Sequence, residues 1–147
     1  PGEYLTLEPS AGTGNLIHAL YAAGNSCREL TAIERHHALC SVVRARFTGD
    51  QYIDPLQRCF LTYAAEMQGR IEFPRIVMNP PFRDVQKHMG AALSLFGCGR
   101  HACATFVALV PISYEHDEAD TLEELDVATF PTAKVSTKLI RFERFHR

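Results

Sequence analysis

Short apolar runs alternate with longer amphipathic segments along most of the chain. Four runs have the composition of strands: residues 4–7, 30–33, 75–78 and 102–110. Four segments repeat apolar side chains at helical spacing: residues 15–23, 39–46, 54–68 and 84–96. Strands that alternate with helices in this way predict a parallel sheet with helices packed against it.

The third strand and the end of the chain are less regular. Residues 47–50 predict a short strand and turn, and Asp54 and Pro55 then have the sequence of a helix N-cap and first helical position. Residues 115–126 hold seven acidic side chains and no Lys or Arg, which indicates a solvated helix and loop. Two final strands with a short connection predict an antiparallel hairpin: residues 127–130 and 137–143.

A glycine-containing turn follows the first strand. Its residues are Glu8, Pro9, Ser10, Ala11, Gly12, Thr13, Gly14 and Asn15. Their small side chains allow a ligand to lie against backbone N–H groups at the start of a helix. The turn lacks the third glycine of the dinucleotide fingerprint, because position 17 is Ile, and it has no P-loop lysine. Glu34 ends the second strand and is placed to accept hydrogen bonds from ribose hydroxyls.

A second motif, Asn79-Pro80-Pro81-Phe82, follows the strand at 75–78. Two prolines fix φ and donate no N–H, so the strand cannot continue through them. The result is a stiff turn that places an amide and an aromatic ring at the carboxyl end of a strand, where open α/β sheets bind their ligands. The alternative is that Asn79 is a strand cap and Phe82 a core aromatic.

Together the two motifs resemble those of S-adenosylmethionine-dependent class I methyltransferases, above all the N6-adenine DNA methyltransferases. The resemblance spans almost the whole chain. It implies an α/β, Rossmann-like, seven-stranded and mostly parallel sheet with helices on both faces and a C-terminal antiparallel hairpin. It also implies S-adenosylmethionine as cofactor, DNA as partner, and a cytoplasmic enzyme of restriction-modification or mobile-element type.

The resemblance assigns roles to the motif residues. Glu8 through Asn15 would border the methionine and ribose of the cofactor, and Glu34 would hold the ribose hydroxyls. Asp50 would accept from the cofactor's adenine amino group, although Gly49-Asp50 is also an ordinary turn pair.

At the second motif, Asn79 and the Pro80 carbonyl would accept the N–H groups of the target amine, and Phe82 would stack on the flipped base. An amide is no strong base, so the proton is expected to leave after methyl transfer.

Two other functions remain open. Related motifs serve RNA bases and protein glutamine side chains, and a degenerate methyltransferase fold could act as a binding module without catalysis. The basic tail could contact phosphates or could be solvated. Its basic residues are Lys134, Lys138, Arg141, Arg144 and Arg147.

Composition further limits the possible domain organisation and function. The 147 residues, 46% of them hydrophobic, predict one domain with a sizeable core. Net charge is −2, which excludes a uniformly basic nucleic-acid binder. The five cysteines include no CxxC pair and predict reduced thiols. Cys98, His101 and Cys103 lack a fourth ligand, so no metal site is predicted. The first residue is Pro1, and we expect that an upstream segment and a target-recognition domain are missing.

Overall fold

The computed structural model describes residues 5–126 and 136–146. Five strands alternate with four helices before the last two strands follow. In chain order the elements are β1 (Thr6–Glu8), α1 (Asn15–Ala22), β2 (Leu30–Glu34), α2 (His37–Arg46), β3 (Leu56–Gln57), α3 (Phe60–Met67), β4 (Arg75–Met78), α4 (Val85–Leu95), β5 (Cys103–Pro111), β6 (Asp120–Leu125) and β7 (Thr137–Phe145).

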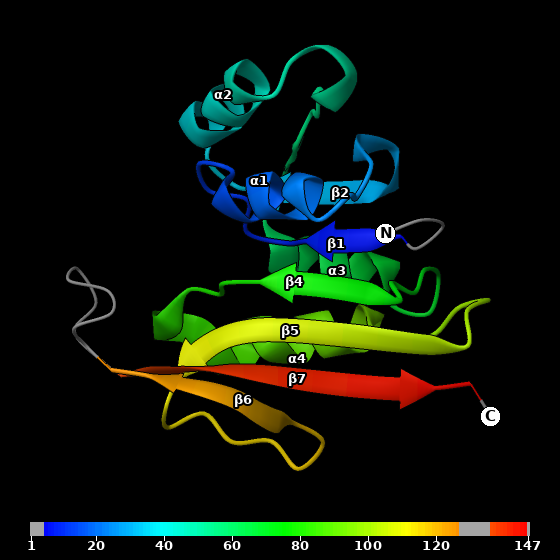
Figure 1. The fold of residues 1–147 in the computed structure, drawn as a ribbon, viewed down its shortest axis with the longest axis vertical. Helices are drawn as coiled ribbons and strands as arrows, with labels where there is room; N and C mark the ends of the chain where they lie inside the picture. The colour runs from blue at the N-terminus through cyan, green and yellow to red at the C-terminus, as the bar shows by residue number, and fades with distance from the viewer. Residues whose placement is uncertain (1–4, 127–135, 147) are drawn as a thin grey trace.

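The strands form one seven-stranded sheet in the order β3-β2-β1-β4-β5-β7-β6 (Figure 1). The first five strands are parallel, whereas β7 runs antiparallel to both β5 and β6. This confirms the predicted Rossmann-like, mostly parallel sheet with an antiparallel pair at the C-terminal end.

Alternation along the strands separates two buried clusters on the two faces of the sheet. In β2, Leu30 and Ala32 pack with α1 and the end of α2, while Ile33 points to the other cluster. That second cluster contains the buried faces of α3 and α4, which lie behind the sheet in Figure 1. The same alternation places Leu7 in the α3 and α4 cluster, so Glu8 points to the opposite face.

The third strand and the helix after it are not where the sequence predicted them. Residues 47–50 do not form a strand, because Phe47 ends α2 and Gly49–Gln51 is a 3-10 turn. The short strand β3 lies later, where Leu56 pairs with Ile33. Asp54 bonds Arg44 at 2.6 Å instead of capping a helix, and α3 begins at Phe60. Pairing with the open edge of β2 therefore makes residues 56–57 a strand, although Asp54 and Pro55 have the sequence of a helix start.

The prediction for the acidic residues 115–126 is also wrong. Residues 120–125 form the edge strand β6 instead of a helix or loop, paired with β7. Ion pairs join this region to the basic tail: Lys138 to Glu115 at 3.3 Å, Arg141 to Asp120 at 3.9 Å and Arg144 to Glu118 at 3.6 Å. The strand predicted at 127–130, together with Lys134 and Arg147, lies outside the described residues.

Candidate functional site

The carboxyl ends of β1, β2 and β4 meet at one edge of the sheet. The chain leaves β1 towards β2 on one side, and later crosses to β4 on the other side, so β1 and β4 flank the topological switch point. Leu7 pairs with Ile76, which places the last residues of these two strands side by side. Ligands of open α/β sheets bind at this position, and both sequence motifs begin there.

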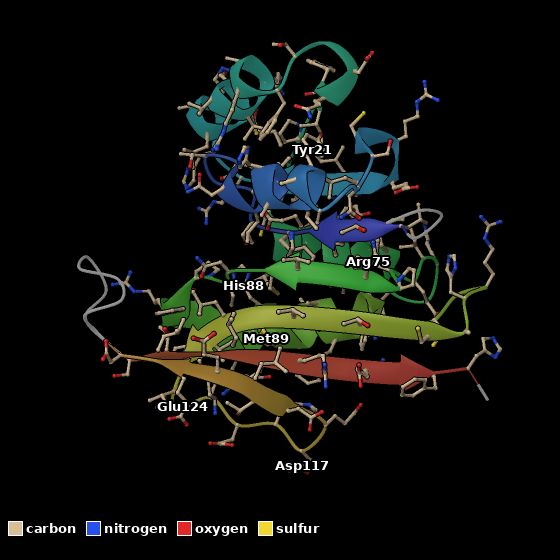
Figure 2. The ribbon with its side chains drawn as sticks, in the orientation of Figure 1. Tyr21, Arg75, His88, Met89, Asp117 and Glu124 are labelled. Carbon is tan, nitrogen blue, oxygen red and sulfur yellow. The ribbon has the colours of Figure 1, made fainter. Side chains whose placement is uncertain are left out.

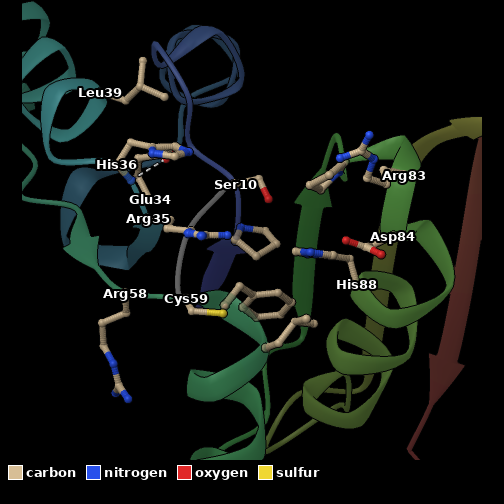
Figure 3. A pocket seen from close by; sticks show the side chains of 14 residues that line it. Ser10, Glu34, Arg35, His36, Leu39, Arg58, Cys59, Arg83, Asp84 and His88 are labelled. Atoms are coloured by element: carbon tan, nitrogen blue, oxygen red, sulfur yellow. Dashed lines mark hydrogen bonds between the residues drawn. The ribbon is translucent and has the colours of Figure 1, made fainter.

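A cavity of about 510 Å³ opens at this edge (Figure 3). Its walls come from the ends of β1 and β2, the start of α3 and the turn before α4. The lining residues are Pro9, Ser10, Glu34, Arg35, His36, Leu39, Arg58, Cys59, Phe60, Leu61, Pro81, Arg83, Asp84 and His88. Its volume lies within the range of small-molecule and cofactor sites.

The cavity brings together some of the predicted site residues and not others. From the two motifs it contains Pro9, Ser10 and Pro81, together with Glu34. The neighbours of Pro81 in its motif differ in exposure: Asn79 is exposed, Pro80 buried and Phe82 half-buried. Asp50 is exposed in the 3-10 turn Gly49–Gln51 and is not among the lining residues.

Glu34 holds the glycine turn in place. Its Oε2 accepts the Gly12 backbone N–H at 2.8 Å, and its Oε1 accepts the His36 backbone N–H at 2.9 Å. The carboxylate is buried at the end of β2. Each oxygen keeps a second lone pair, so Glu34 can still accept a hydrogen bond from a ligand in the cavity.

Glu8 is a fully buried carboxyl at the end of β1. Its Oε1 accepts the Ser10 backbone N–H at 2.8 Å, whereas its Oε2 has no hydrogen-bond partner. Burial raises the pKa of Glu8 to about 8, opposed by the Ser10 hydrogen bond and reinforced by the nearby charge of Glu34. An unpartnered buried carboxyl oxygen is costly, and a cationic ligand group beside it would offset that cost.

The rest of the glycine turn is fixed from the side of α2. Gly14 has φ of 94°, and a Cβ there would lie 2.7 Å from the Phe47 ring. Arg46 donates from Nη1 to the Thr13 carbonyl at 3.0 Å and to Asn15 Oδ1 at 2.9 Å. Gly14 is therefore required by the packing of the turn itself. At Gly12, with φ of 56°, an added Cβ would meet no protein atom closer than 3.9 Å.

Sequence reasoning missed the wall of the cavity formed by the start of α3. Cys59 is exposed there, and its pKa is lowered mainly because the Thr62 backbone N–H donates to the sulfur, with a further contribution from Arg35 across the cavity. Correct placement of β3 would have identified this wall, because Arg58 and Cys59 directly follow that strand.

His88 lies on the opposite wall, on α4. Burial lowers the pKa of His88 against the opposing effect of Asp84, so the ring is neutral near pH 7. Its ring packs at a tilt against Phe60, with 6.2 Å between centroids, and its Nδ1 is buried without a hydrogen-bond partner. The sequence pattern indicated only an apolar stripe at this position, and the unpartnered nitrogen adds a polar group to the cavity wall.

Within residues 5–126 and 136–146, no group of three or more His, Cys, Asp or Glu side chains is arranged to hold a metal ion. In the same part of the chain, no helix combines the length and apolar character that crossing a bilayer requires.

Comparison with known proteins identifies the fold. No protein-family model matches the sequence, and no curated protein matches it. Three similar solved structures are the 23S rRNA methyltransferase ErmE, an rRNA methylase from Streptococcus thermophilus and a dimethyladenosine transferase from Plasmodium falciparum.

Their TM-scores are 0.67, 0.65 and 0.62 at 18%, 11% and 14% identity, respectively. The matches cover 96%, 98% and 95% of this chain and 61%, 88% and 55% of the respective structures. The chain therefore has the Rossmann-like fold of these methyltransferases.

Proposed function

We propose that this protein is an S-adenosylmethionine-dependent methyltransferase that acts on the exocyclic N6 amine of adenine in nucleic acid. One observation carries the proposal. Pro9 and Ser10 of the glycine turn, Glu34 at the end of β2 and Pro81 of the proline turn line one cavity at the switch point of the sheet. Asn79 and Phe82 belong to the same short turn as Pro81, although they are not among the lining residues. A cofactor and an acceptor amine can meet only where the residues that bind each of them converge.

The residues at the cavity fit S-adenosylmethionine. Glu8 is buried directly before Pro9 and Ser10 and does not itself line the cavity, and its Oε2 is unpartnered. Once ionised, its carboxylate would complement a positive charge, which this cofactor carries at its sulfonium and its amino group. Glu34 retains acceptor capacity for ribose hydroxyls, and Gly12 leaves open space beside Ser10. When bound, the cofactor supplies an electrophilic methyl group. The residues of the turn would bind and orient it. Asp50 lies in the 3-10 turn Gly49–Gln51 before β3, and its contact with the cofactor's adenine amino group stays a prediction.

The acceptor side is formed by the proline turn. Asn79 is exposed directly after β4, so its amide oxygen is free to accept an N–H of the target amine together with the Pro80 carbonyl. The rigid prolines fix the position of both acceptors. The half-buried ring of Phe82 offers a face on which the target base can stack. These groups act by position and oriented dipoles rather than by removing a proton.

DNA is the first candidate acceptor because Asn-Pro-Pro-Phe resembles the motif of N6-adenine DNA methyltransferases. RNA is the second, and it is favoured by the names of two similar structures, an rRNA methylase and the rRNA methyltransferase ErmE. Incubating the protein with methyl-labelled S-adenosylmethionine and with adenine-containing DNA, RNA or a glutamine-containing peptide tests the proposal. Label in N6-methyladenine supports it. Label in glutamine, or absence of cofactor binding by calorimetry, contradicts it.

Replacing Gly12 by Asn should weaken S-adenosylmethionine binding by about tenfold or more, because a side chain would occupy space that the ligand needs. Asn tolerates positive φ better than most residues, so the fold should survive. Gly49 is the matched control, since its φ is 62° and its surroundings are also open, but it lies in the turn before β3 and not in the glycine turn beside Ser10. Isothermal calorimetry on both variants measures the effect, and equal affinities for Gly12→Asn and Gly49→Asn would place the cofactor elsewhere.

Cys59 offers a test that requires no substitution. Its lowered pKa and exposure at the cavity predict faster alkylation by iodoacetamide than at Cys40, which is buried and has a pKa raised by burial. Bound S-adenosylmethionine should slow the modification of Cys59 by several-fold by covering it. Peptide mass spectrometry over time measures both rates. Unchanged modification of Cys59 at saturating cofactor would mean that the ligand does not reach the α3 wall.

A further inference from the structure

Arg83 occupies a distinctive position beside the acceptor side of the cavity. It directly follows Phe82 in the 3-10 turn Phe82–Asp84, and it lines the cavity together with Pro81. In Figure 3 its guanidinium extends from the wall opposite Arg35. A charged group in this place lies next to the ring on which the target base is proposed to stack.

Arg83 makes no hydrogen bond or ion pair with the described part of the chain, and its side chain is exposed. Two other arginines near the cavity are engaged: Arg58 pairs with Glu66 at 2.5 Å, and Arg46 bonds the glycine turn. Arg35 also lines the cavity and makes no hydrogen bond or ion pair with the described residues, but it directly follows Glu34 at the end of β2 and not the proline turn. The neighbouring Asp84 lies close to His88 in Figure 3 and acts on its titration.

The basic residues of β7 are less available than Arg83 for binding an anion. Lys138, Arg141 and Arg144 each pair with an acidic side chain of the 115–126 stretch or of β7 itself. Figure 2 shows Glu124 and Asp117 at the margin formed by β6 and the loop before it. In the sheet, β4, β5 and β7 separate β6 from β1, where the glycine turn begins. A polyanion is repelled at that acidic margin, and Arg83 presents a free positive charge at the cavity.

From this arrangement we propose that Arg83 binds a backbone phosphate next to the target nucleotide, and hence that the acceptor is a nucleic-acid strand and not a protein side chain. The inference rests on the proposed function and adds the residue that would bind the backbone of its substrate. A guanidinium matches a phosphate with two parallel hydrogen bonds. A base stacked on Phe82 carries its own phosphates with it, whereas a glutamine side chain brings no anionic group.

The test is the binding of two fluorescent probes, a short single-stranded DNA containing one adenine and the RNA of the same sequence, measured by anisotropy over a range of salt concentrations. Arg83→Ala should bind several-fold more weakly. The slope of log K against log salt should become shallower by about 0.7, the contribution of one phosphate contact on a single strand. Arg83→Lys should keep the slope and recover part of the affinity, because a point charge remains.

Arg100→Ala is the matched control, because Arg100 is exposed near the amino end of β5 and lies outside the cavity. It should leave affinity and slope unchanged, and Arg83→Ala should bind S-adenosylmethionine normally by calorimetry. Equal effects of Arg83→Ala and Arg100→Ala would overturn the inference, while N6-adenine methylation by either variant would leave the proposed function standing. Failure of the unsubstituted protein to bind either probe would also overturn it. The probe that binds more tightly shows whether the protein prefers deoxyribose or ribose in the acceptor strand.

Discussion

Replacing Asn79 by Ala should lower the rate of methyl transfer by about 10²–10³-fold, while the affinity for S-adenosylmethionine changes by less than about twofold. Asn79 lies at the end of β4, exposed, and its side chain makes no hydrogen bond with the described residues. Truncation therefore removes no interaction that supports the fold. It removes the acceptor that orients the target amine, so single-turnover kinetics should show the loss in the chemical step and calorimetry should not.

Gln68→Ala is a suitable control for this experiment. Gln68 is another exposed amide, at the opposite end of α3 from the cavity, and its loss should change neither quantity. A large loss of cofactor affinity in Asn79→Ala would contradict the assigned role, because it would place Asn79 in the cofactor site. Transfer at the normal rate would mean that the proline turn does not hold the acceptor amine.

Glu8→Gln should remove a strong pH dependence of stability. The pKa of Glu8 is raised from 4.5 to about 8, mainly by burial, so the folded state keeps the carboxyl protonated where the unfolded chain ionises it. The contribution of Glu8 to the free energy of unfolding is fully present below pH 4.5. It is lost as the pH rises to about 8, at about 1.4 kcal/mol per pH unit. The total is on the order of several kcal/mol, a large share of a typical free energy of unfolding.

Urea denaturation at several pH values across that window measures the effect. The unsubstituted protein should become less stable as the pH rises, and Glu8→Gln should lack this part of the decline because an amide does not titrate. Glu66→Gln, at an exposed carboxyl paired with Arg58, should retain the decline. Identical pH profiles for the unsubstituted protein and Glu8→Gln would show that Glu8 is ionised in the folded state.

The fold could be predicted because its main strands and helices carry strong local patterns. The apolar run of β5 and the stripe of α4 need no tertiary information. The two places where prediction failed lack such patterns. Both residues of β3, Leu56 and Gln57, are exposed, and only pairing with the edge of β2 makes them a strand. Strand β6 is acidic and almost fully exposed, and its pairing with β7 outweighs its low strand propensity.

Part of the cavity wall could be named from the sequence, because Pro9, Ser10, Glu34 and Pro81 line it. The glycine turn and the proline turn are contiguous motifs, so their residues could be named from the sequence. Cys59, Arg83 and His88 come to the cavity from separate elements, through the position of α3 and the rotation of α4 about its axis. No spacing in the sequence encodes that convergence. The error in β3 also changes the place of Asp50, which was predicted to follow the third strand and in fact precedes it, in the 3-10 turn Gly49–Gln51.

The acidic character of β6 has a consequence for how the molecules behave in solution. An edge strand exposes unpaired backbone groups to which a strand of a second molecule could add, and Leu122 of β6 is itself 48% exposed. Asp120, Glu123 and Glu124 lie on the same strand and are exposed. A second copy approaching edge to edge would bring its own carboxylates against these, so repulsion discourages the sheet from extending into aggregates.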